Sequence, residues 1–67
     1  MTPDHFDDCL QAIRWTPGVL AGVLGCEESL VRKWATGQTE VPVAVEAWIK
    51  ALAAIHRAIE AGKPEVS

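Results

Sequence analysis

The sequence has little positive charge and no long hydrophobic run. Six lysines and arginines stand against nine aspartates and glutamates, and the net charge of −3 argues weakly against a nucleic-acid partner. No apolar segment approaches the roughly 20 residues of a membrane helix. The opening "MTPDHFDD" lacks the basic and apolar regions of a secretory signal. We therefore expect a cytoplasmic protein with no membrane partner.

Cysteine and histidine are also scarce. Cys9 and Cys26 are too few for a disulfide framework, and we expect two reduced, partly buried thiols. His5 and Cys9 share a helix face, but two ligands do not complete a metal site. The sequence contains no nucleophile–base constellation and no glycine-rich phosphate loop. We therefore expect no enzymatic activity, no metal and no cofactor.

The sequence does contain enough apolar residues for one small helical domain. Hydrophobic residues make up 49% of the 67 positions, which is too many for a disordered chain. Alternating strand patterns and Asn-Gly turns are absent, whereas helical spacing is frequent. A chain of this length is only marginally stable by itself, so dimerisation would help.

Helix start and stop signals divide the chain into four segments. The spacing predicts helices over residues 3–14, 17–24, 27–35 and 42–61. Thr2 and Thr16 are N-caps, each followed by a proline at the first helical position. Gly25 and Gly37 are expected to end the second and third helices. We predict one domain over residues 1–61 and a flexible tail over residues 62–67.

Positive charge is concentrated in one part of the chain. Residues 1–28 carry five acids and one base, and residues 40–67 carry four acids and three bases. Residues 29–39 carry Arg32 and Lys33 and no acid, so this is the only net-positive window. It overlaps the third predicted helix.

Small and apolar residues recur in a fixed order in the middle of the chain: Leu20, Ala21, Gly25, Val31, Trp34, Gly37, Val41, Pro42 and Trp48. Over positions 4–53 this order resembles the pattern "LA..LG....V..W..G...VP..V..W" of the Cro/cI-type (XRE-like) helix-turn-helix regulators, with five residues instead of four between Gly25 and Val31. Ala21 would let the two motif helices cross closely, and Gly25 would permit the tight turn between them. The resemblance implies an all-α, compact four-helix (lambda-repressor-like) helix-turn-helix domain with a long C-terminal helix.

The resemblance also implies a function and a set of contacts. It predicts a dimeric, sequence-specific repressor of the autoregulatory, phage or anti-CRISPR-associated kind. Its second motif helix would enter the major groove of double-stranded DNA at an inverted repeat. The base-contacting positions carried over from the family are Glu27, Glu28, Ser29, Arg32 and Lys33. The phosphate-contacting positions are Thr16, Pro17, Gly18, Thr36, Gly37, Gln38 and Thr39.

Two glutamates at the start of this helix depart from the family pattern, as does Cys26, which is a poor N-cap. In one interpretation, Glu27 and Glu28 stabilise the positive end of the helix dipole, and Glu28 pairs with Arg32 one turn later. In the other, a glutamate accepts a hydrogen bond from the N4 group of cytosine. The first interpretation is favoured by about two to one.

The last predicted helix has more apolar surface than a small bundle needs. Its apolar positions step by three or four and are Val45, Trp48, Ile49, Leu52, Ile55 and Ile59. The candidate dimer interface within this set is Trp48, Leu52, Ile55 and Ile59. An alternative hypothesis is a protein-interaction module, antitoxin-like or adaptor, with weak or no DNA readout.

Overall fold

The computed structural model describes residues 1–66, and this part of the chain contains helices and no strands. The four helices are α1 (Pro3–Ile13), α2 (Pro17–Leu24), α3 (Glu28–Thr36) and α4 (Val43–Ala61). The predicted all-α class with a long last helix is therefore confirmed. Residues 62–66 follow α4 as exposed, non-helical chain, and Ser67 of the predicted tail lies outside the described residues.

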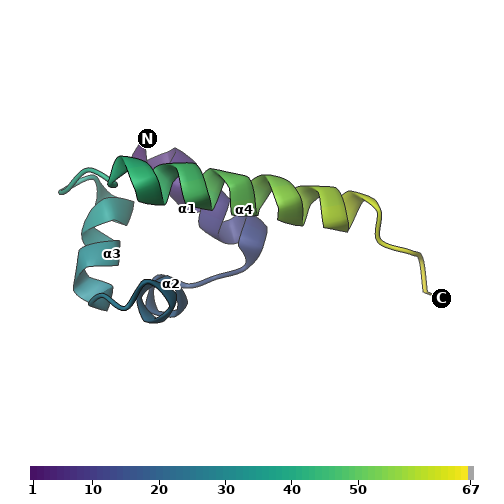
Figure 1. Ribbon diagram of the computed structural model, residues 1–67, viewed down its shortest axis with the longest axis horizontal. Coiled ribbons are helices and arrows are strands. Elements are labelled where there is room, and N and C mark those ends of the chain that lie inside the picture. Colours follow the sequence, from purple (N-terminus) through teal and green to yellow (C-terminus); the bar gives the residue numbers. More distant parts are fainter. Residues whose placement is uncertain (67) are drawn as a thin grey trace.

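Figure 1 shows how the helices are arranged. Helix α4 runs along the long dimension of the molecule, and α1 lies against it. Helix α3 stands across the N-terminal end of α4, and α2 is seen almost end-on beside the start of α3. Helix α1 packs against both α4 and α3, while α2 packs against α3. Helix α1 therefore joins the α2–α3 pair to the long last helix.

Four helix boundaries differ by one residue from the approximate predicted ones. Arg14 adopts a left-handed conformation (φ 60°) and caps α1 instead of continuing it. Glu27 is extended and precedes α3, which runs on to Thr36 instead of ending at residue 35. Pro42 is likewise extended and precedes α4. Arg14, Glu27 and Pro42 are the cap residues of their helices, and a cap residue has non-helical backbone angles.

The helix N-caps agree with the prediction. The Thr2 hydroxyl accepts a hydrogen bond from the His5 amide at 3.1 Å, and the Thr16 hydroxyl accepts one from the Val19 amide at 3.2 Å. Each bond satisfies one of the amides that a helix start leaves without a partner. The two threonine-proline pairs therefore fix where α1 and α2 begin.

The first three helices end in the same way. A left-handed residue, Arg14, Gly25 or Gly37, follows each helix. The next amide then bonds back to a carbonyl five residues earlier: Trp15 to Leu10 at 3.0 Å, Cys26 to Ala21 at 3.0 Å and Gln38 to Lys33 at 3.0 Å. This is the Schellman geometry, which satisfies carbonyls at the helix end and turns the chain sharply.

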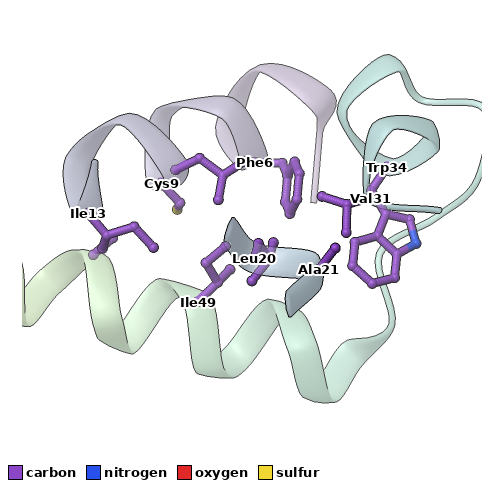
Figure 2. Packing of buried hydrophobic residues seen from close by; sticks show 10 residues of the cluster. Phe6, Cys9, Ile13, Leu20, Ala21, Val31, Trp34 and Ile49 are labelled. Carbon is purple, nitrogen blue, oxygen red and sulfur yellow. The ribbon is translucent and has the colours of Figure 1, made fainter. Parts of the chain in front are cut away.

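Ten apolar side chains form one core between the helices (Figure 2). The buried residues are Phe6, Cys9, Leu10, Ile13, Leu20, Ala21, Val31, Trp34, Ile49 and Ala53. The Trp34 ring meets the Phe6 ring edge to face, with centroids 6.1 Å apart and an interplanar angle of 84°. Burial raises the pKa of the Cys9 thiol, so this side chain acts as a small apolar group.

Helix α4 is buried over less of its length than its spacing predicts. Only Ile49 and Ala53 are fully buried, and Ile55 and Ile59 are 56% and 64% exposed. The molecule measures 43 × 20 × 18 Å, and the second half of α4 extends beyond the body formed by the other helices (Figure 1). No helix of residues 1–66 has the length and apolar character needed to cross a membrane.

Ion pairs join the chain start and α1 to α4. The Met1 ammonium lies 3.2 Å from Glu46 Oε1, and Lys50 Nζ lies 3.1 Å from the same oxygen. Two hydrogen bonds hold the pKa of Glu46 below its usual range. The larger effect comes from Lys50 and the smaller one from the terminal ammonium. Arg14 Nη2 lies 3.2 Å from Glu60 Oε1 and links the end of α1 to the last turn of α4.

A matched pair of valines tests the packing. Val31 is fully buried and Val43 is 80% exposed. We expect Val31→Ala to lower the free energy of unfolding by about 1–3 kcal/mol, because it leaves a cavity between α3 and α1. Val43→Ala should change it by less than about 0.5 kcal/mol. Urea denaturation followed by circular dichroism measures both, and equal losses would contradict the described core.

Candidate nucleic-acid interface

Helices α2 and α3 are joined by a turn of residues 25–27. Gly25 takes the left-handed conformation (φ 71°) that its predicted role requires. The residue before α3 is Glu27 and not Cys26, and the Glu27 side chain makes no capping hydrogen bond. The first amides of α3 therefore lack a side-chain cap, which leaves the start of the helix open to an external acceptor.

Helix α3 has two distinct faces. Val31 and Trp34 are buried in the core. Ser29, Arg32 and Thr36 are exposed and recur every three or four residues, so they share the opposite face of the helix. Lys33 is exposed beside them. One side of α3 thus holds the helix to the body, and the other presents short polar and basic side chains to solvent.

The predicted pairing of Glu28 with Arg32 is confirmed. Arg32 Nε donates to Glu28 Oε2 at 2.7 Å, and Arg32 Nη2 lies 2.5 Å from the same oxygen. The two residues are one helical turn apart, and both side chains are about half exposed or more. An exposed pair of this kind contributes only a few tenths of a kcal/mol to stability.

The second oxygen of the same carboxylate lies against α2. A Cβ atom built on Gly18 would be 2.6 Å from Glu28 Oε1 and 3.8 Å from the Thr16 hydroxyl. Such a 2.6 Å separation is closer than real Cβ contacts allow. Glu28 therefore occupies space beside the first turn of α2 that exists because residue 18 has no side chain.

The charges of the turn and of α3 cancel. Glu27 and Glu28 offset Arg32 and Lys33 over residues 27–36. Glu27 Oε2 accepts a hydrogen bond from the Ser29 hydroxyl at 3.4 Å. Lys33 forms no ion pair with any residue in the range 1–66. The ammonium of Lys33 is thus the uncompensated positive charge on this helix.

The predicted phosphate-contacting residues form two groups, at the ends of the α2–α3 unit. Thr16, Pro17 and Gly18 lie at the start of α2. The amides of Val19 and Leu20 bond to the Thr16 hydroxyl and carbonyl. Pro17 has no N–H, so Gly18 supplies the remaining amide of that first turn.

The second group, residues 36–39, forms the end of α3. The amide of Gly37 bonds to Trp34, and those of Gln38 and Thr39 bond to the Lys33 carbonyl. The Thr36 hydroxyl also donates to that carbonyl, at 3.3 Å. These backbone amides are occupied within the chain, so the exposed Gln38 and Thr39 side chains are the donors left for a phosphate.

Gly37 has a second role that the sequence pattern did not indicate. Its φ of 81° favours glycine, and a Cβ at this position would lie 2.9 Å from Pro3 Cγ. The end of α3 therefore packs closely on the start of α1. This contact fixes the angle at which α3 leaves the body.

The candidate dimer residues lie along one side of α4. Trp48, Ile55 and Ile59 are exposed, with 37% of Trp48 accessible to solvent, and Leu52 is half-buried against the core. The Trp48 ring packs on Trp15, with centroids 6.0 Å apart. Trp15 is therefore a packing residue whose ring contacts the ring of Trp48.

Residues 1–66 were also searched for a metal site and for a pocket. No three acidic, cysteine or histidine side chains lie close enough together in this range to hold a metal ion. A shallow depression between α1 and α4 is lined by residues of both charges, including Asp8, Arg14, Arg57 and Glu60.

Comparison of the chain with protein-family models, curated proteins and solved structures gives no match.

The exposed position of Arg32 and Lys33 leads to a prediction about stability. We expect Arg32→Ala and Lys33→Ala each to change the free energy of unfolding by less than about 0.5 kcal/mol, since both side chains contact solvent and the ion pair is weak. Chemical denaturation measures this directly. A loss of about 2 kcal/mol or more, which is typical of a buried contact, would mean that these side chains stabilise the fold.

Proposed function

We propose that this chain is a sequence-specific DNA-binding transcriptional regulator with a lambda-repressor-like helix-turn-helix domain, and that α3 enters the major groove. The observation that carries the proposal is the division of α3 into a face anchored by Val31 and Trp34 and an exposed face bearing Ser29 and Arg32. A helix with its side chains is about 10–12 Å across, which matches the roughly 12 Å width of that groove.

Each exposed residue of α3 has a contact suited to its chemistry. Arg32 donates to the O6 and N7 atoms of guanine, and Lys33 donates to guanine or a phosphate. Ser29 contacts a base edge near the start of the helix. Glu27, which no cation neutralises within residues 1–66, accepts from the N4 group of cytosine. Phosphates contact the first turn of α2 and the side chains that follow α3.

The regulator acts as a homodimer on an inverted repeat. Two copies related by a twofold axis place two α3 helices about 34 Å apart, on half-sites one helical turn apart. The exposed apolar side of α4 supports this part of the proposal, because single domains of this size gain stability from association. The resulting protein is a cytoplasmic repressor, autoregulatory in a phage or anti-CRISPR-associated setting, that blocks a promoter by occupying it.

A second candidate function rests on a different observation. The charges of residues 27–36 cancel, while Ile55 and Ile59 on α4 are mostly exposed. These two features together favour a protein-interaction module of the antitoxin or adaptor kind. In such a module α4 binds a partner protein, and α3 does not recognise DNA bases. Both functions are binding functions without catalysis.

Selection from random DNA tests the main proposal. We expect the wild type to enrich an inverted repeat with half-site centres about 10 base pairs apart from a pool of random duplexes. Arg32→Ala and Lys33→Ala should weaken binding to the enriched site at least about tenfold. Arg57→Ala is the control, because this exposed arginine lies on α4, and it should keep affinity within about twofold. A wild type that enriches no sequence at moderate salt would favour the interaction module.

The dimer is tested on α4. We expect Ile55→Glu to raise the dimer dissociation constant at least about thirtyfold, because it places a charge in an apolar interface. Val43→Glu is the matched control, since Val43 lies seven residues before Lys50 and hence on the charged side of α4. Size-exclusion chromatography with light scattering measures both. A wild type that remains a monomer at high concentration would contradict the dimer.

A further inference from the structure

We propose that Glu28 is a positioning residue that orients the Arg32 guanidinium for reading guanine, and that the missing side chain of Gly18 leaves the space that the second oxygen of Glu28 occupies. The inference rests on the proposed DNA-binding function and adds a mechanism for its specificity. It depends on how the two oxygens of one carboxylate are used.

The first oxygen of Glu28 takes one edge of the guanidinium and leaves the other edge available. Arg32 Nε and Nη2 both point to Oε2. A guanidinium carries five N–H groups in a planar fork, so a contact through Nε and Nη2 leaves the Nη1 protons and the second Nη2 proton. These remaining protons form the end of the fork, which matches the paired O6 and N7 acceptors of guanine.

The second oxygen lies close to another helix. A Cβ atom on residue 18 would be 2.6 Å from Oε1, so this oxygen lies beside the first turn of α2. The positive end of the α2 dipole favours a carboxylate at that place. Glu28 therefore lies between Arg32 and the start of α2, and a side chain at residue 18 would compete for the space of its second oxygen.

The arrangement is specific to Glu28 and Arg32 among the charged residues of this surface. Glu27 contacts the Ser29 hydroxyl and no cation within residues 1–66. Lys33 has no carboxylate partner in the same range. Of the two cations of α3, Arg32 alone thus has a carboxylate partner within residues 1–66 in the free protein, which predicts the strongest base preference at the base pair that Arg32 contacts.

Two glycines of α2 provide a matched test that leaves α3 untouched. Gly18→Ala places a methyl group 2.6 Å from Glu28 Oε1, so the carboxylate must move away from α2. Gly22→Ala makes the same chemical change in the same helix, with nothing within 4 Å of the new atom. Both changes favour the helix, so a difference between the two variants reports the contact with Glu28.

Two isosteric changes of charge form the second matched pair. Glu28→Gln removes the charge that holds Arg32. Glu65→Gln changes the net charge equally, at an exposed carboxylate that forms no ion pair within residues 1–66 and lies outside the proposed DNA interface. Any difference between these variants therefore cannot come from the overall charge of the protein, which acts equally in both.

The first measurement uses the free protein. In ¹⁵N-resolved NMR spectra, we expect the Arg32 Nε–H signal to be shifted and protected from exchange in the wild type, Gly22→Ala and Glu65→Gln. In Gly18→Ala and Glu28→Gln it should move to the position of an unbonded arginine. Unchanged Arg32 signals in these last two variants would overturn the positioning role without involving DNA.

The second measurement uses the duplex that the wild type enriches from a random pool. The base pair at which Arg32→Ala loses its preference is first identified, and the ratio of dissociation constants for guanine and adenine at that position is then compared. We expect Gly18→Ala and Glu28→Gln to reduce this ratio at least about fivefold, and both controls to keep it within about twofold.

The outcomes separate the inference from the function. Enrichment by the wild type with an unchanged guanine ratio in Gly18→Ala and Glu28→Gln overturns the inference and leaves DNA binding intact. The same holds if Arg32→Ala alters no base preference. A wild type that enriches no sequence overturns the proposed function, and with it the guanine-reading role of Arg32.

Discussion

The structure depends on how α3 is attached to the body by one side only. Trp34 packs edge to face on Phe6, and Val31 is fully buried next to it. The close contact of Gly37 with Pro3 fixes the other end of the same helix. These three contacts all lead to α1, which in turn packs on α4. Because α3 packs on the body through Val31 and Trp34, the opposite face of the helix makes no core contacts and stays exposed to solvent.

An acidic chain can meet a polyanion if its charges are arranged locally. Helix α3 begins with Glu28, yet that carboxylate turns toward Arg32 and the first turn of α2. Its negative charge is thus partly offset within the chain. Such a surface would neutralise few phosphates, so the proposed DNA binding would depend on dimerisation and base contacts more than on counterion release. The proposal therefore needs both the exposed side of α4 and the exposed face of α3.

Local features of the sequence predicted local structure well. Thr2 and Thr16 cap the predicted helices, and Gly25 and Gly37 end them, because capping depends on residues that are neighbours in the chain. Arg14 was predicted to continue α1, since an arginine seldom takes the left-handed conformation that the chain imposes there. The Glu28–Arg32 pair was also predictable from its spacing.

Contacts between helices could be predicted less well from the sequence. The spacing of α4 could not show that Ile55 and Ile59 are mostly exposed, because this depends on which parts of α4 the other helices cover. Gly18 was assigned a phosphate contact, but its proximity to Glu28 follows from the crossing of α2 and α3. Periodicity identifies an apolar face without identifying what covers it.

The most direct test of the account is an NMR titration of the ¹⁵N-labelled protein with duplex DNA, starting from the most enriched sequence of a random pool. The account predicts that the amide signals of Ser29, Arg32 and Thr36 shift most and saturate together. Signals of Asp7 and Gln11, on the exposed side of α1, should remain in place. Shifts confined to α4 with α3 unchanged, or no saturable change, would contradict it.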